Sequence, residues 1–393
     1  MPTRTFGAVC SILALALAVL YLWCPVHSFP AAQPFHGSRW YNPYAALTPG
    51  THWHKANLHA HSRVWHGVTN GHGSAEEVIA RYRALGYDVA PTSNYQEISQ
   101  AASAGPSTLT VYEQGYNARK VHFLAVAPRR VDWLDYPLLQ GRDEEQHRID
   151  RLAASAGLVI LAHPRLRGAL PDADLRALTG YAAMEIGSNA SRGEHSWDVA
   201  LDAGRAVWGV ANDDTHHVDK PNEIGRYWTM IAASTTEGAA LDSALRAGRA
   251  YAVFGRHGQA DVALRSFTLL GDTLSVVFDG APAALQLVGP GGRVLATALS
   301  TDSTRWVIPC DAAWVRVAAH TRTSHLFLEP VIRTETGALP QLSAPVAPLP
   351  TYARRVTAAV LVLLVAMAWA AIFVGRSATG ESLGADEGMR SAA

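Results

Sequence analysis

Short apolar runs that end in polar residues alternate with stretches of helical character over the first two thirds of the chain. The apolar runs predict β-strands at residues 87–92, 121–127, 158–162 and 206–211. The helical stretches lie at residues 74–85, 143–156, 197–206 and 237–247. The first of them opens on Ser74-Ala75-Glu76-Glu77, a capping box. This alternation favours a largely parallel sheet, either a barrel or a doubly wound fold.

The pattern changes near Arg265, where short alternating apolar runs are separated by Gly, Asp, Pro and Ser. The runs cover residues 267–270, 274–278, 285–288, 294–298, 306–308, 315–319 and 326–331. Short strands at this spacing predict a small all-β sandwich. The runs carry no evident chemistry, so we expect the sandwich to have a packing or positioning role.

Two longer apolar segments lie near the ends of the chain. Residues 6–24 follow Arg4, and both a retained signal anchor and a cleaved signal peptide fit them. Residues 356–374 are long and uniformly apolar, which predicts a transmembrane helix. Arg4 favours an extracytoplasmic body, whereas Arg354 and Arg355 on the body side of the second segment oppose it. We expect a membrane protein with an extracytoplasmic body.

These patterns divide the chain into seven parts. We expect a signal anchor or signal peptide at 1–24, a connector at 25–50, an α/β domain at 51–260, the sandwich at 261–336, a Pro-rich linker at 337–355, the transmembrane helix at 356–374 and a polar tail at 375–393.

The composition of this 393-residue chain excludes some functions and some kinds of site. Its 33 basic residues balance 33 acidic ones without a basic run, which argues against nucleic-acid binding. The three cysteines, Cys10, Cys24 and Cys310, exclude a disulfide framework and a cysteine-based zinc site. Twelve of the 17 histidines lie between His52 and His217, so metal chemistry is expected in that region.

The most informative histidines are His59 and His61, one residue apart after a short apolar run. On an extended backbone such a pair points both imidazoles to the same side, and neutral imidazole is a common metal ligand. Other polar residues also follow predicted strands: Ser93 and Asn94, His163, and Asp213 to His216. Strand ends converge on one face of an α/β barrel, so we expect these residues to meet.

Taken in order, these motifs resemble those of the PHP (polymerase and histidinol phosphatase) superfamily of metal-dependent phosphoesterases. The matching motifs, within about residues 53–255, are HAHS at 59–62, TSN at 92–94, Glu113, VHFL at 121–124, LAHP at 161–164 and DDTH at 213–216. The resemblance implies a distorted (β/α)7 barrel, here followed by the sandwich and bounded by terminal transmembrane segments.

The resemblance also implies metal ligands by position. They are His59, His61, Glu113, His122, His163, Asp214 and His216, with catalytic roles for Asp214 and His216. Ser93-Asn94 stands where the family usually has Asp-His, so we expect two divalent ions (zinc, manganese or iron) rather than three. His66, five residues after His61, is an alternative ligand that could compensate, and Asn94 could itself act as a weaker ligand.

The leading hypothesis is phosphoester hydrolysis by a metal-activated hydroxide, with Asp214 orienting the water. Arg165, Arg167 and Arg192 are candidates for binding the phosphate, because guanidinium matches its oxygens. Carboxyl ester or carbamate hydrolysis, favoured by an apolar pocket without guanidinium groups, and non-catalytic metal or ligand binding remain alternatives. The terminal anchors favour a small-molecule or cell-envelope substrate near a membrane.

Overall fold

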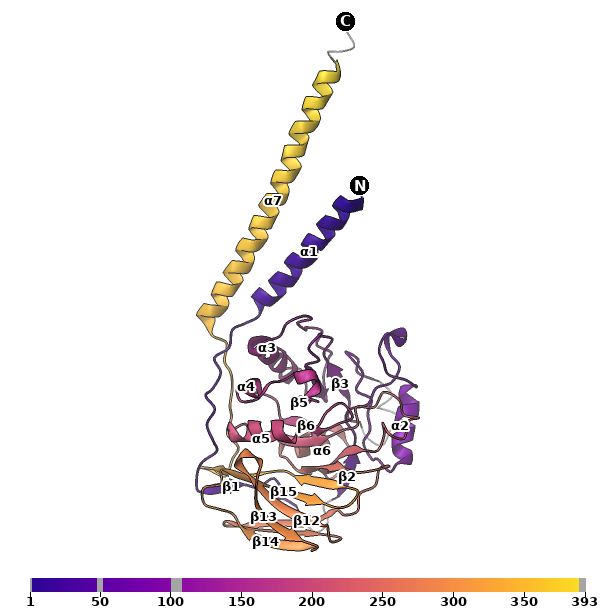
Figure 1. Ribbon diagram of the computed structural model, residues 1–393, viewed down its shortest axis with the longest axis vertical. Coiled ribbons are helices and arrows are strands. Elements are labelled where there is room, and N and C mark those ends of the chain that lie inside the picture. Colours follow the sequence, from indigo (N-terminus) through magenta and orange to yellow (C-terminus); the bar gives the residue numbers. More distant parts are fainter. Residues whose placement is uncertain (1, 48–51, 100–107, 389–393) are drawn as a thin grey trace. The chain divides into compact units, whose positions relative to one another are not determined.

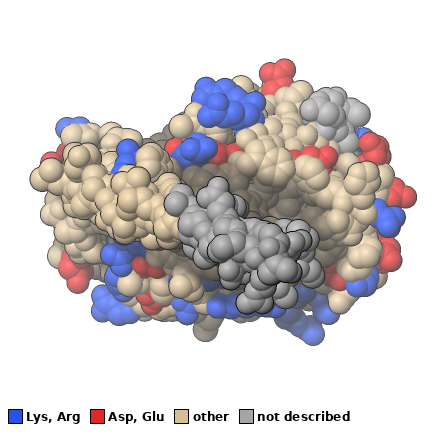
Figure 2. Space-filling view, turned by 90° about the horizontal axis from the view of Figure 1, so that it is seen from above, with Lys and Arg blue, Asp and Glu red and all other residues tan. Residues whose placement is uncertain are grey.

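The computed structural model describes residues 2–47, 52–99 and 108–388 (Figure 1). The chain forms two compact units. The larger unit is Phe29–Ala344, and the smaller one combines Met1–Ser28 with Pro345–Ala393. The face shown in Figure 2 carries both basic and acidic side chains.

A five-stranded sheet is formed by strands between residues 111 and 211 of the larger unit (Figure 1). Its order is β3 (Val111–Gln114), β4 (His122–Val126), β5 (Leu158–Ala162), β6 (Ala183–Gly187) and β7 (Trp208–Ala211). All residues of these five strands are buried. Only the β5–β6 and β6–β7 pairs are parallel, whereas β3–β4 and β4–β5 are antiparallel. The expectation of a largely parallel sheet is therefore right only for β5 to β7.

A nine-stranded antiparallel sheet contains strands from both sides of the predicted boundary at residue 260. Its path is β1 (Arg39–Tyr41), β17 (Val331–Thr334), β15 (Trp314–His320), β16 (His325–Leu328), β9 (Ala250–Phe254), β8 (Tyr227–Ala232) and β2 (Trp53–Ala56). In addition, β12 (Ala284–Gly289) pairs with β15, and β13 (Arg293–Leu299) pairs with β12. Because β16 pairs with β9, the predicted sandwich shares a sheet with the α/β part.

The remaining strands form a three-stranded sheet. Its order is β10 (Leu264–Leu270), β11 (Thr273–Phe278) and β14 (Ser303–Val307). All seven apolar runs predicted after Arg265 are confirmed as strands, but the last run splits into β16 and β17. Pro330 lies at the split, where its missing N–H interrupts the ladder. In the described part of the chain the strands form three sheets, and the closed barrel stays a prediction.

The four predicted helices are confirmed, with shifted ends. The helices of the larger unit are α2 (Ala75–Ala84), α3 (Arg142–Ala153), α4 (Asp172–Leu175), α5 (Glu194–Asp202) and α6 (Gly238–Arg246). Ser74 caps α2 through the predicted capping box. The predicted strand at 87–92 is wrong, because this segment contributes only a parallel bridge between Val89 and Ala56. Pro91 cannot donate to a strand ladder, which limits pairing there.

The smaller unit holds two long helices, α1 (Pro2–Trp23) and α7 (Pro348–Gly388). Their stretches Phe6–Trp23 and Pro348–Ala371 are long and apolar enough to cross a membrane, a property that signal sequences and buried core helices share. The Arg355 guanidinium lies 5.4 Å from the centre of the Trp23 ring. α7 begins within the predicted Pro-rich linker, because prolines are tolerated in the first helical turn.

Candidate metal centre

Strand direction brings three of the predicted ligands to one edge of the five-stranded sheet. β4 runs antiparallel to both neighbours, so its first residue, His122, lies opposite Ala162, the last residue of β5. His163 follows Ala162 directly. Glu113 lies near the end of β3, which pairs with β4 in the opposite direction. The start of β4 and the ends of β3 and β5 therefore meet.

The other four ligands come from two loops joined through their backbones. The His61 N–H donates to the Thr215 carbonyl at 2.8 Å, and the Asp214 N–H donates to the His59 carbonyl at 2.9 Å. This pairing places His59 and His61, which follow β2, beside Asp214 and His216, which follow β7. His163 and Asp214 both have positive φ angles, of 27° and 54°, a strained conformation that is common at functional sites.

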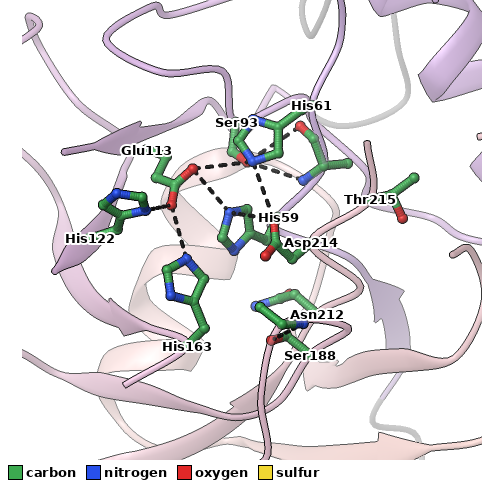
Figure 3. A network of polar contacts seen from close by, with 12 residues as sticks. His59, His61, Ser93, Glu113, His122, His163, Ser188, Asn212, Asp214 and Thr215 are labelled. Atoms are coloured by element: carbon green, nitrogen blue, oxygen red, sulfur yellow. Dashed lines mark hydrogen bonds and ion pairs between the residues drawn. The ribbon is translucent and has the colours of Figure 1, made fainter. Parts of the chain in front are cut away.

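Glu113 lies between two pairs of histidines (Figure 3). Its Oε2 atom lies 3.3 Å from His59 Nε2 and 3.1 Å from His61 Nε2. Its Oε1 atom lies 2.6 Å from His122 Nδ1 and 3.2 Å from His163 Nε2. One carboxylate therefore faces two separate sets of imidazole nitrogens.

Asp214 completes the first of these sets. Its Oδ1 atom lies 3.3 Å from the Nε2 atoms of both His59 and His61, and 3.9 Å from His216 Nδ1. We call the seven predicted ligands the His/Glu/Asp cluster: His59, His61, Glu113, His122, His163, Asp214 and His216. Its residues form four overlapping groups of three that could hold a metal ion, with ligand atoms within 4.8 Å of one another.

The arrangement of the donor atoms in the cluster suits metal binding better than hydrogen bonding among these side chains. The Nε2 atoms of His59 and His61 and the Oε2 atom of Glu113 are buried and have no well-oriented hydrogen bond within the described chain. Such buried groups are costly unless something else satisfies them. Ligands about 2.0–2.2 Å from one ion lie about 3.0–3.5 Å apart, which matches the separations of these atoms.

Burial and neighbouring charges oppose each other in the cluster. Burial alone would raise the pKa of Glu113, but His122 and His59 hold it well below its ordinary value. Burial lowers the pKa of His59, but the carboxylates of Asp214, Glu185 and Glu113 outweigh it and raise that pKa well above the ordinary value. Burial, with the nearby His61, lowers the pKa of His216 to about 4.

Glu185 on β6 is a residue that the sequence analysis missed. Its Oε1 atom lies 2.9 Å from His59 Nδ1 and accepts a hydrogen bond from Asn212 Nδ2 at the same distance. Its Oε2 atom accepts from the His163 N–H at 2.9 Å. The sequence feature that could have identified Glu185 is a single carboxylate within the apolar run Ala-Met-Glu-Ile-Gly. This run was not predicted as a strand.

The structure also separates the two aspartates of the DDTH motif. Asp214 faces the cluster, whereas Asp213 accepts hydrogen bonds from the Arg226 and Tyr227 N–H groups on one oxygen. Its other oxygen accepts from the Tyr82 hydroxyl and the Gly225 N–H. Burial raises the pKa of Asp213 to about 6. Asp213 therefore fixes the loop that presents Asp214.

Other candidates from the sequence lie outside the cluster. His66 is exposed, and the Asn94 amide oxygen accepts from the Ser62 N–H at 2.8 Å. Arg165 pairs with Asp172 at 2.9 Å. Arg192 pairs with Glu194 and lies 4.4 Å from the Phe254 ring centre. Arg167 is exposed, and none of the three arginines contacts the cluster in the described part of the chain.

No model of a known protein family matches the chain, and no curated protein matches it. A similar solved structure is a two-domain protein from Bacteroides vulgatus that contains a predicted PHP-like metal-dependent phosphoesterase. The two share 14% sequence identity with a TM-score of 0.40, over 80% of this chain and 99% of that chain.

Proposed function

We propose that this chain is a metal-dependent hydrolase of the PHP type that acts on phosphoesters. The position of Glu113 between two pairs of histidines is the observation that carries the proposal. A carboxylate with each oxygen facing its own set of nitrogens is suited to bridge two cations. The ordered motifs of the sequence support the same function independently of the fold comparison.

The donor set suggests how two ions would be held. His59, His61, Glu113 and Asp214 would hold one ion, with His216 as a further ligand beside His61 and Asp214. Glu113, His122 and His163 would hold the other. Imidazole and carboxylate donors without thiolate suit zinc, manganese or iron. Bound ions of this kind supply Lewis acidity toward a phosphoryl oxygen and lower the pKa of a water molecule.

The chain itself supplies orientation and proton transfer. Glu185 would accept the Nδ1 proton of His59, so that Nε2 would be the atom that binds an ion. The side chain of His216 is 21% exposed, more than that of Asp214 at 7%, while its Nε2 atom is buried and has no hydrogen-bond partner in the described chain. We assign to Asp214 the orientation of the attacking water, and to His216 Nε2 the exchange of a proton with the substrate.

The remaining parts of the proposal rest on the sequence. α1 and α7 would tether the protein to a membrane with the body on the extracytoplasmic side. The substrate would be a small molecule or a cell-envelope ester. The residues around the cluster would belong to a distorted barrel of the PHP kind.

Carboxyl ester or carbamate hydrolysis is the second candidate, and one observation favours it. Arg165 and Arg192 are each paired with a carboxylate, so neither offers a free guanidinium group to a phosphate. The same cluster could act on a carboxyl ester or a carbamate, which is uncharged, unlike a phosphate ester, and so needs no arginine to bind it.

The test measures metal content and hydrolysis on the full chain in lipid nanodiscs. The substrates are p-nitrophenyl phosphate, bis(p-nitrophenyl) phosphate and p-nitrophenyl acetate. The His59→Ala/His61→Ala variant removes two ligands, and His36→Ala/His195→Ala is the matched control, because both of those histidines are exposed.

We expect two ions per chain and phosphoester turnover that the first variant loses and the control keeps. Turnover of the acetate alone would favour the second candidate. Less than one bound ion, with no turnover after zinc, manganese or iron is added, would refute catalysis and leave a metal- or ligand-binding domain.

A further inference from the structure

A cavity of about 350 Å³ lies at the ends of β5, β6 and β7 opposite to the His/Glu/Asp cluster. The cluster follows the last residues of β5 and β7, whereas the cavity is lined by residues at or just before the first ones, such as Leu158, Ala182 and Val207. The cluster and the cavity therefore lie at opposite ends of the strands of one sheet.

A second cavity of about 350 Å³ lies beside the first. Its walls come from residues 30–36, residues 203–205 and the segment after β17. The two cavities share four lining residues: Arg205, Leu339, Pro340 and Leu342. Each has the size of a small-molecule site, which is typically about 300–1,000 Å³.

Arg205 is the polar residue common to both cavities, and its hydrogen bonding is incomplete. The side chain is only 4% exposed. Its Nη2 atom donates to the carbonyls of Pro30 and Arg176, but its Nε and Nη1 atoms are buried without an acceptor among the described residues. The Tyr181 hydroxyl on the wall of the first cavity is also buried without a partner there. Buried donors of this kind are costly unless an acceptor satisfies them.

The other basic side chains on these walls have acidic partners. Arg246 pairs with Asp242 at 2.9 Å, and Arg333 lies 3.4 Å from Asp272. His36 lies 3.9 Å from Glu335. Within the described residues that line the cavities, Arg205 is thus the arginine without a carboxylate partner, so an anion is the ligand that would complete its bonding.

The other walls of the second cavity are largely apolar, whereas the first cavity exposes more polar than apolar surface. Leu178 and Trp208 line the first cavity, Phe35 lines the second, and Leu339 and Leu342 line both. The walls of the second cavity therefore favour an alkyl chain over a second charged group.

We propose that these two cavities form a binding site for a single-chain amphipathic anion, with its head on Arg205 and its alkyl chain along the apolar walls. The site is separate from the His/Glu/Asp cluster and does not depend on the proposed hydrolase function. A fatty carboxylate and an alkyl phosphate share this chemistry.

Binding is tested on the full chain in phosphatidylcholine nanodiscs, with radiolabelled decanoate in equilibrium dialysis and with empty nanodiscs subtracted. Decyl phosphate distinguishes the two head groups, and decanol has the same chain length without the charge. Arg205→Gln removes the cation. Because Arg205 also holds Pro30, Leu342→Trp is a second variant that fills both cavities and leaves the arginine in place. Arg293→Gln, on an exposed arginine elsewhere, is the matched control.

We expect saturable binding of one decanoate or decyl phosphate per chain, and the tighter of the two identifies the head group. Arg205→Gln and Leu342→Trp should each weaken binding about tenfold or more, whereas the control should not change it. Decanol that binds as well as decanoate would overturn the role of Arg205. Binding no greater than to empty nanodiscs, or unchanged in both variants, would overturn the site itself.

Discussion

Single carboxylates determine much of the chemistry near the cluster. Glu185 holds both His59 and the backbone of His163, so it orients one histidine from each set around Glu113. Its two oxygens accept from three donors, the third being the Asn212 amide. A carboxylate accepts hydrogen bonds on both of its oxygens. A side-chain amide has one accepting oxygen, and its other polar group is a donating NH2.

Glu185→Gln should therefore weaken metal binding without unfolding the protein. The amide NH2 group must face at least one of the three donors, which misorients His59 or the His163 loop. We expect metal affinity to fall about 10–100-fold, as is typical when a residue that orients a ligand is changed. The measurement is competition with a chelator, with Glu76→Gln on the exposed surface as the control. Unchanged affinity would show that Glu185 does not orient the ligands.

Glu145 on α3 is a second buried carboxylate, with a different consequence. Both of its oxygens are buried and lack hydrogen-bond partners among the described residues. Burial raises its pKa from 4.5 to about 9, despite the nearby Arg119 and Arg148. Between these two pH values the folded chain keeps a proton that the unfolded chain releases. The free energy of unfolding should therefore fall as the pH rises through this range.

Glu145→Gln should remove this pH dependence, because the amide does not ionise. We expect the variant to be about 1–3 kcal/mol more stable than the parent chain at pH 7, with a smaller difference at pH 5. Thermal and urea unfolding at both pH values measure the effect. The control is Glu237→Gln, whose side chain is exposed. A stability gain that is equal at the two pH values would contradict this explanation.

At the scale of elements, the connection from β3 to β4 positions one histidine set. Gly115 follows β3 with a φ of 148°, which side chains rarely allow. A Cβ atom there would lie 2.4 Å from His122 Cδ2 and 3.0 Å from the Val121 carbonyl oxygen. The absence of a side chain at Gly115 therefore lets His122 approach Glu113.

Gly115→Ala should displace His122 and remove one of the two proposed ions. The ion held by His59, His61 and Asp214 should remain, because those residues come from other loops. Elemental analysis should then find about one ion per chain in place of two. Gly86→Ala is a matched control, since Gly86 also has a positive φ, of 76°, but open space around its Cβ position. Two retained ions in Gly115→Ala would contradict the assignment of His122.

At the scale of the whole larger unit, the C-terminal strands are bound to the part that carries the cluster. β16 pairs with β9, and the Arg316 guanidinium on β15 donates two hydrogen bonds of 3.0 Å to the Asp198 carboxylate on α5. The Trp314 indole N–H donates to Asp202 on the same helix. These buried contacts indicate one cooperative unit rather than two independent domains.

Arg316→Ala should therefore destabilise the entire larger unit. It leaves Asp198 buried without its cation, which costs about 3–5 kcal/mol. We expect one unfolding transition at a lower temperature, recorded both by circular dichroism and by loss of metal. Arg305→Ala, on the exposed face of β14, should have little effect. Two separate transitions would show that the sheets unfold independently.

The sequence alone determined the features that depend on local chemistry. The Ser74 capping box predicts where α2 begins, and the continuous apolar run at 158–162 predicts β5 with its observed ends. The ordered motifs also identified the seven residues that lie together in the cluster, although their role as ligands stays a prediction. Caps, turns and buried runs need only neighbouring residues, so a single sequence contains them.

Only the tertiary structure decided the features that depend on distant partners. It separated Asp214 from Asp213, identified Glu185, placed Arg165 and Arg192 on acidic partners, and joined strands across residue 260 into one sheet. Strand direction, pairing and the orientation of a side chain are set by packing against residues far away in the sequence. For that reason the chemistry could be expected from the motifs, whereas the arrangement that would perform it could not.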